Sequence, residues 1–235
     1  MGIYPNVGVV GLFREEKRYD IIANNLSNIQ TVGFKKDIPV FHKTFSAALD
    51  LPLAEDPIQP VTIFQQGELQ PTQNEMDLAI EGEGFFKVKT PGGIRYTRSG
   101  NFHLNWDRIL VQSNGYPVLG SGREINLQGN HMVIDKDGTI SADGSNQGKI
   151  DLVTFADLNG LKKEGQTLFK LVKEQDEIEP KQSQIQQGSL EFSNVNALEE
   201  MVRMIDSLRT FQGSDKIVQV QDELNGKVVN DLAKV

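Results

Sequence analysis

The sequence predicts an α+β protein, with helical segments at both ends and an antiparallel β-rich barrel or sandwich between them. Two observations carry this prediction. Apolar residues recur at helical spacing near both termini, whereas the middle of the chain alternates apolar and polar residues between closely spaced turn signals. The expected boundaries are 1–35 for the N-terminal helical segment, 36–192 for the β-rich domain and 193–235 for the C-terminal helical segment.

The N-terminal segment carries apolar residues at helical spacing, among them Val7, Val10 and Ile21. The helix is expected to end near Asn28, because Gly33 follows as a residue suited to a left-handed turn.

The middle of the chain contains short runs that alternate apolar and polar residues, as half-buried strands do. Phe85–Thr90 shows this alternation, and Pro91–Gly93 then predicts a turn into a second strand, Ile94–Arg98. Further turn signals, such as Asn114–Gly115 and Asp137–Gly138, follow at intervals of roughly 8–12 residues, which is typical of a compact antiparallel barrel or sandwich.

The C-terminal segment begins with a helix start signal, because Asn196 can cap a helix and Glu199 occupies the capping-box position. The apolar stripe that follows changes phase after Gly213, so two faces of the predicted helix are apolar. Its members before the change are Leu198, Met201, Val202, Ile205 and Leu208, and those after it include Ile217, Val220 and Leu224. A helix with two apolar faces is expected to have more than one neighbour.

The bulk composition excludes several classes of function. The formal net charge is −8 and the 24 Lys and Arg residues are scattered, which argues against nucleic acid as a partner. The basic pairs Lys35–Lys36 and Lys162–Lys163 are interpreted as solvated surface residues. The chain has no cysteine, which removes thiol nucleophiles, zinc-thiolate sites and disulfides. No apolar run approaches the roughly 18 residues of a membrane span, and the N-terminus lacks the pattern of a cleavable secretory signal.

No set of polar residues has the spacing of a catalytic, cofactor or metal site. Glu81 and Glu83 could imitate a glycosidase acid pair, but such pairs normally come from different elements across a cleft. His42, His103 and His131 lack the spacing of metal ligands. We therefore expect no catalytic residue, no cofactor and no metal.

Three blocks of sequence, one near each end and one in the middle, carry a family pattern. The first joins Ile22–Asn28 to Thr31–Lys35, the second joins Asp77–Phe86 to Tyr96–Phe102, and the third is Ser193–Asn196 before Glu200–Val202. In content and order these blocks resemble the flagellar basal-body rod and hook proteins. The sequence departs from the family pattern at Ser27, Gln212 and Arg108, and Arg108 stands where a turn glycine is common, so this turn is expected to differ.

The resemblance implies a fold and a role. It implies that the terminal helices pack as a coiled-coil-like layer lining an axial tube, with the β-rich domain outside it. The protein would be a structural subunit of the rod rather than an enzyme. Its implied partners are itself and other rod subunits, with ring proteins and the rod cap as neighbours, and without nucleic acid or membrane insertion. Its implied location is the flagellar basal body, reached by type III export without a cleaved signal peptide.

The residues expected at the assembly interface combine the helical stripes with asparagines of the terminal blocks. They are Val7, Val10, Ile21, Asn24, Asn25, Leu26, Asn28, Asn194, Asn196, Leu198, Met201, Val202, Ile205, Leu208, Ile217 and Leu224.

The subtype within the family is indicated by two features. The block Tyr96–Arg98 favours the rod over the hook, and the short stretch 36–77 favours the proximal rod over the distal rod, which is the alternative. An alternative of another class is a secreted β-rich module that binds cell-wall glycan through an aromatic platform of Trp106, Tyr96 and Tyr116.

Overall fold

The computed structural model describes residues 7–41, 58–129, 131–165 and 167–232, and the chain divides into two compact units. The helical unit comprises Met1–Ser27, Asp37–Val61 and Asn196–Val235. The β unit comprises Asn28–Lys36 and Thr62–Val195. Each unit is therefore assembled from segments that are far apart in the sequence.

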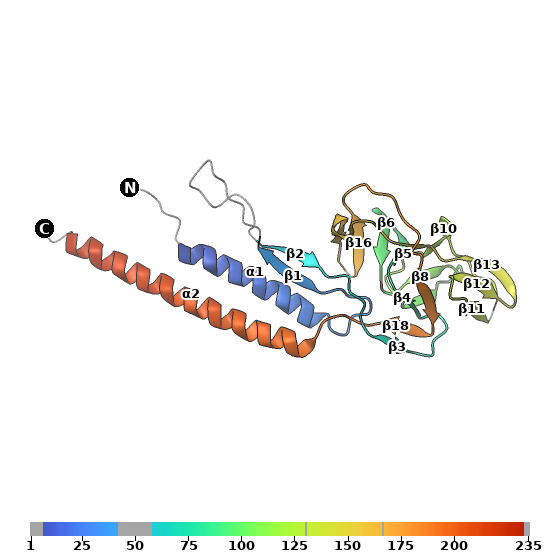
Figure 1. Ribbon diagram of the computed structural model, residues 1–235, viewed down its shortest axis with the longest axis horizontal. Helices are drawn as coiled ribbons and strands as arrows, with labels where there is room; N and C mark the ends of the chain where they lie inside the picture. The colour runs from blue at the N-terminus through green and yellow to red at the C-terminus, as the bar shows by residue number, and fades with distance from the viewer. Residues whose placement is uncertain (1–6, 42–57, 130, 166, 233–235) are drawn as a thin grey trace. The chain divides into compact units, whose positions relative to one another are not determined.

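The helical unit is built on two helices that lie side by side, α1 (Val7–Ser27) and α2 (Ala197–Leu232) (Figure 1). They run antiparallel, because Asn25 near the end of α1 meets Glu200 near the start of α2, whereas Glu15 meets Ser207. A two-stranded sheet of β1 (Asp37–Phe41) and β2 (Ile58–Thr62) follows α1 in the chain. Neither described helix contains an 18-residue stretch apolar enough to span a membrane.

The ends of the helices follow from local sequence signals. α1 ends at Ser27, one residue before the expected Asn28. Asn196 caps α2, since its Oδ1 accepts hydrogen bonds from the backbone nitrogens of Leu198 at 3.0 Å and Glu199 at 3.3 Å. The predicted cap is therefore confirmed.

The β unit contains the remaining strands, and those that pair with one another in the described part of the chain do so antiparallel. The strands are β3 (Leu69–Pro71), β4 (Leu78–Glu81), β5 (Phe85–Thr90), β6 (Gly93–Thr97), β7 (Phe102–Leu104), β8 (Leu110–Gln112), β9 (Leu119–Gly120), β10 (Arg123–Glu124), β11 (Met132–Ile134), β12 (Thr139–Ala142), β13 (Ser145–Lys149), β14 (Leu152–Val153), β15 (Leu161–Lys163), β16 (Leu168–Leu171), β17 (Gln184–Gln187) and β18 (Ser189–Glu191), with a 3₁₀ helix at Leu158–Gly160. The largest sheet has five strands in the order β14-β5-β6-β16-β15.

The α+β class with antiparallel strands is confirmed, but the described strands form no closed barrel. They are short and are distributed over several small sheets: β11-β12-β13, β17-β4, β18-β3, β7-β8 and β10-β9 accompany the five-stranded sheet. The predicted hairpin of β5 and β6 is present, with Thr90 paired to Gly93 across the turn.

Two hydrophobic clusters fill the β unit, and two adjacent residues of β5, Phe85 and Phe86, pack in different clusters. Phe86 packs in the larger cluster, where its ring meets that of Phe102 edge-on with centroids 5.1 Å apart. Phe85 points to the other side of the strand and meets Phe169 in the second cluster, with centroids 5.7 Å apart. This alternation is the period of two that the sequence predicted for this strand.

The segment Asn28–Lys36, which follows α1, belongs to the β unit and contains Gly33, whose φ of 71° is the expected left-handed conformation. A side chain here would place Cβ 2.3 Å from the backbone nitrogen of Ser99. The backbone nitrogen of Gly33 also donates a hydrogen bond to the carbonyl of Glu191 at 2.7 Å. Both the backbone angle and the close approach therefore require glycine.

Candidate functional site

A row of apolar side chains is exposed along α2. We call this row the outer stripe, and it consists of Leu198, Met201, Val202, Ile205, Leu208, Phe211, Ile217, Val220 and Leu224. Its exposed fractions run from 38% at Phe211 to 73% at Leu198. Single exposed apolar residues are normal, but a row of this length on one element makes it the candidate for an interface.

Two buried polar side chains of α2 meet α1 on the side opposite Ile205. Ser207 and Glu200 are each only 1% exposed. Ser207 donates a hydrogen bond to Glu15 Oε2 at 3.0 Å, and Asn25 Nδ2 lies 3.5 Å from Glu200 Oε2. Ile205 precedes Ser207 by two residues, and two residues on an α-helix are about 200° apart. The part of the outer stripe from Leu198 to Leu208 therefore points away from α1, whereas Phe211, four residues after Ser207, lies on the same side of the helix as Ser207.

The outer stripe changes direction around the helix along its length. α2 runs without interruption through Gly213, where the apolar pattern shifts phase. At about 100° per residue, the part formed by Ile217, Val220 and Leu224 is rotated by roughly 90° from the part before Gly213. One continuous helix thus presents apolar side chains in two directions.

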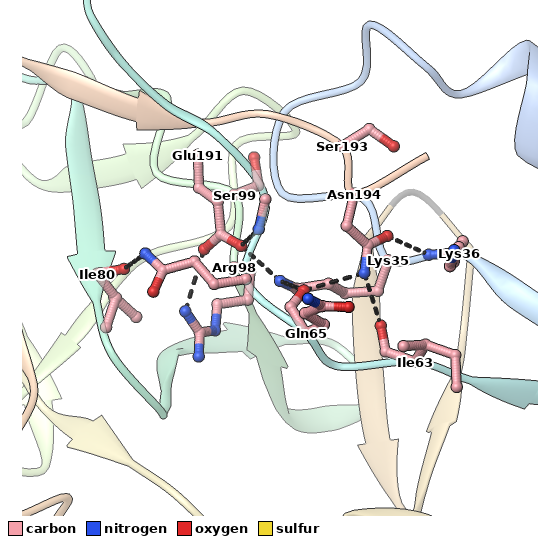
Figure 2. A network of polar contacts seen from close by, with 12 residues as sticks. Lys35, Lys36, Ile63, Gln65, Ile80, Arg98, Ser99, Glu191, Ser193 and Asn194 are labelled. Carbon is pink, nitrogen blue, oxygen red and sulfur yellow. Dashed lines mark hydrogen bonds and ion pairs between the residues drawn. The ribbon is translucent and has the colours of Figure 1, made fainter. Parts of the chain in front are cut away.

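A cluster of three buried charged side chains lies in the β unit (Figure 2). The Glu191 carboxylate accepts a hydrogen bond from Lys35 Nζ and another from Arg98 Nη1 at 3.0 Å. The side chains of Lys35 and Glu191 are 0% exposed and that of Arg98 is 4% exposed. Burial lowers the pKa of both Lys35 and Arg98, because removal from water disfavours their charged forms, while Glu191 opposes this shift. The interpretation of Lys35 as a solvated residue is therefore wrong.

The side chain of Asn194 ties two further segments of the β unit together. Its Oδ1 accepts a hydrogen bond from the backbone nitrogen of Lys36 at 2.7 Å. Its Nδ2 donates to the carbonyls of Ile63 and Gln65, each at 2.9 Å (Figure 2). The segment before α2 is thus fastened to the segment after α1 by side-chain and backbone hydrogen bonds.

The predicted interface residues fall into different environments. Those on α2 with apolar side chains, Leu198, Met201, Val202, Ile205, Leu208, Ile217 and Leu224, all belong to the outer stripe. Asn25, Asn194 and Asn196 bond within the chain, with Asn25 exchanging hydrogen bonds with the backbone of Asp37 at 2.8 and 2.9 Å. Ile21, Leu26 and Asn28 are partly buried, and Asn24 is exposed. The side chains of Val7 and Val10 lie outside the described residues, and the role of the whole set in assembly stays a prediction.

Sequence reasoning missed the buried cluster of Lys35, Arg98 and Glu191. The partners are distant in the chain, since 156 residues separate Lys35 from Glu191. One signal was available, because Lys35 and Arg98 both lie inside the blocks that carry the family pattern.

The described residues form neither a metal site nor the aromatic platform proposed for glycan binding. No group of three or more His, Cys, Asp or Glu side chains among them could hold a metal ion. The glycan platform is wrong for Tyr96, which is 5% exposed and donates its hydroxyl to Glu177 Oε1 at 2.7 Å. Burial, helped by this carboxylate, raises the pKa of Tyr96. Trp106, by contrast, is fully exposed, so the two rings share no surface.

Family models match three parts of the chain. Residues 6–35 match the flagella basal body rod protein model, residues 79–142 match the flagellar hook protein FlgE/F/G D1 domain, and residues 186–232 match the flagellar basal body rod FlgEFG protein C-terminal model.

Curated relatives match over nearly the whole chain. The flagellar basal-body rod protein FlgF of Caulobacter vibrioides is 35% identical, over 98% of this chain and 99% of the relative. The flagellar basal-body rod protein FlgG of Borreliella burgdorferi is also 35% identical, and that of Bacillus subtilis is 32% identical, each over 95% of this chain and 96% of the relative. The chain therefore belongs to the family of flagellar basal-body rod proteins.

Proposed function

We propose that this chain is a structural subunit of the flagellar rod that polymerises through its terminal helices. The outer stripe carries the proposal, because it is apolar and exposed, and its part from Leu198 to Leu208 is directed away from α1. A head-to-tail contact between different patches generates a helical filament when it does not close into a ring. The two directions of the stripe supply apolar surface for two different neighbours, which would pack against it in a coiled-coil-like layer. Segments 1–35 and 193–235 would then form the axial layer, with 36–192 outside it.

The polymer proposal is tested by placing a charge in the outer stripe. Ile205 is 50% exposed and Leu224 is 56% exposed. Ile205→Asp and Leu224→Asp should therefore change the free energy of unfolding by less than about 1 kcal/mol, as surface substitutions do. In the polymer the new carboxylate would be buried without a partner, so incorporation into basal bodies should be lost.

A matched control separates the stripe from a general effect of charge on α2. Thr210 is exposed on α2 about 140° around the helix from Ile205, so Thr210→Asp adds the same charge to another face and is the matched control for Ile205→Asp. Chemical denaturation of the purified variants and immunoblotting of isolated basal bodies are the measurements. Normal incorporation of Ile205→Asp and Leu224→Asp, or equal loss with Thr210→Asp, would show that the outer stripe is not the interface.

We further propose that the subunit belongs to the proximal part of the rod. Sequence identity does not distinguish the two subtypes, because relatives called FlgF and FlgG both reach 35%. The support is therefore the short stretch between residues 36 and 77. Immunogold labelling of isolated basal bodies locates the subunit along the rod. Label at the hook-facing end only would assign it to the distal rod instead.

The proposal includes export by the flagellar type III apparatus without cleavage, and contact with other rod subunits, ring proteins and the rod cap. The membership of the rod family supports it. The intact mass of the protein from basal bodies tests the export route, because a mass lower than that of the full chain would reveal processing.

A further inference from the structure

The only tryptophan of the chain is held at the tip of a rigid turn, with its side chain in water. Trp106 lies between β7 and β8 and is 103% exposed, so its indole contacts almost nothing in its own chain. An indole is among the largest apolar groups a protein has, and leaving it in water forgoes the free energy of its burial. A partner that covers it would recover that free energy.

The backbone of this turn is fixed by hydrogen bonds on both sides of Trp106. Asn105 Oδ1 accepts from the backbone nitrogens of Asp107 at 3.0 Å and Ile109 at 2.9 Å. The Asn105 carbonyl accepts from the backbone nitrogen of Arg108 at 2.9 Å. Binding therefore orders little backbone here, which lowers its entropic cost.

Arg108 adds a second restraint from its side chain. Its φ of 60° is the left-handed conformation that glycine favours, so the turn keeps a glycine-like backbone at this position. The guanidinium secures it, with Nε donating to the carbonyl of Leu127 at 2.7 Å and Nη2 donating to the carbonyl of Gly129. Trp106 is thus presented by a turn that is restrained before any partner arrives.

Elsewhere on the β unit an open hollow of about 630 Å³ lies between the β5–β6 turn and the β9–β10 turn. Its apolar lining includes Pro91, Leu119 and Ile94, and Ile94 is 43% exposed. The volume falls within the range of about 300–1,000 Å³ that is usual for binding pockets. Because Trp106 is fully exposed, the indole of the same chain does not occupy this hollow.

The charges around the two features are complementary. Asp107 adjoins Trp106 and has no ion-pair partner among the described residues. At the hollow, Lys89 is paired with Glu124 at 2.9 Å, which leaves Arg123 as the basic side chain without such a partner in the described part of the chain. Arg123 can therefore pair with a carboxylate next to an inserted indole and can also lie over the face of that indole.

We propose that Trp106 of one copy docks into the hollow beside Ile94 on a second copy of this chain, where Asp107 pairs with Arg123. The contact joins two different patches, so it propagates from copy to copy wherever the same two copies do not exchange it reciprocally. The inference rests on the proposed polymeric role, to which it adds a contact made by the β unit.

Single cysteines test this contact cleanly, because the chain has none of its own. Full-length Asp107→Cys and Arg123→Cys chains are mixed at high concentration in solution, co-expressed for incorporation into basal bodies, and oxidised in both settings. We expect a disulfide-linked pair in the mixture and none above background with either chain alone. Adding Trp106→Ala to the Asp107→Cys chain should lower the yield about tenfold or more, as loss of a central aromatic anchor does. Asn114→Cys, at another exposed turn, replaces Arg123→Cys as the matched control.

The fluorescence emission wavelength of Trp106 is a second, independent measure of whether its indole is buried by a partner. We expect it to shift to shorter wavelength as the chain is concentrated, and Ile94→Asp to abolish the shift while the near-UV circular dichroism stays native. A shift of the dilute monomer with soluble peptidoglycan fragments, and none on concentration, would overturn the proposal in favour of glycan binding.

The outcomes distinguish this inference from the polymer proposal. Chains present in basal bodies that yield no mixed disulfide overturn the Trp106 contact and leave the rod assignment intact. A mixed disulfide in solution from chains that never enter basal bodies supports the contact and overturns the rod assignment. If there is neither a mixed disulfide nor incorporation into basal bodies, both the Trp106 contact and the rod assignment are refuted.

Discussion

Replacing Glu191 by glutamine should damage the β unit more than removing either of its cationic partners. The buried cluster holds two cations, Lys35 and Arg98, and a single carboxylate. Glu191→Gln keeps the shape of the side chain but removes the negative charge, so two buried cations face a neutral amide. The amide group also cannot accept at both positions, and the carboxylate presently accepts from Gly67 N at 3.0 Å as well.

The size of the effect follows from the burial of the cluster. Removing one partner of a buried ion pair costs about 3–5 kcal/mol, because the remaining charge is left uncompensated in a low-dielectric site. Lys35→Met leaves the Arg98–Glu191 pair balanced and removes one donor, so its cost should be about 1–3 kcal/mol. The expected order is the unusual part, since deleting a cation should be milder than neutralising the anion.

Urea unfolding followed by near-UV circular dichroism measures this order in the β unit. The signal reports on packed rings such as Tyr96 and Phe155, whose centroids are 4.8 Å apart. With a slope of about 2 kcal/mol/M, a loss of about 4 kcal/mol moves the midpoint down by roughly 2 M. Lys36→Met is the control, because the hydrogen bond described for Lys36 uses its backbone nitrogen and not its side chain. If Lys35→Met costs as much as Glu191→Gln, the argument from charge imbalance is refuted.

Three further substitutions have defined outcomes. Gly213→Ala should stabilise α2 by about 1 kcal/mol, since the new Cβ meets no atom within 4 Å, and a higher helical melting midpoint by circular dichroism would show it. Asn196→Ala should destabilise α2 by about 1 kcal/mol through loss of its cap, measured in the same way, and no change would argue against the cap. The hydrogen bond from Arg95 lowers the pKa of Glu164, so this carboxylate contributes stability above its ordinary pKa that is lost as pH falls through the lowered value. Glu164→Gln should therefore flatten the acid limb of a stability–pH profile, and an unchanged limb would contradict this.

Features determined by neighbours along the chain could be predicted from the sequence. The Asn196 cap, the left-handed Gly33 and the β5–β6 hairpin each depend on a few adjacent residues, and all three are present. Closure of the strands into a barrel depends on pairing between distant segments. No local pattern encodes it, and this expectation was wrong.

The candidate site shows the same division. The spacing of apolar residues predicted the stripe of α2. It did not predict that the stripe is exposed, because spacing alone does not say which part of the chain covers a helix face. The structure shows that Ser207 and Glu200 face α1, whereas Ile205 lies on the opposite side of the helix. The burial of Lys35 could not be predicted either. Two adjacent lysines are typical of a solvated surface, and only the fold brings Glu191 next to Lys35.

The exposure of the outer stripe has a consequence for the supply of subunits before assembly. A free subunit carries these nine apolar side chains uncovered, and such surfaces cause nonspecific clumping when the molecules accumulate. If the stripe is the polymer contact, the tip of a growing rod offers matching surface immediately, whereas two free subunits must first find the correct register. Elongation would then outpace spontaneous nucleation, so the same side chains that bind the rod together would also confine its growth to one place in the cell.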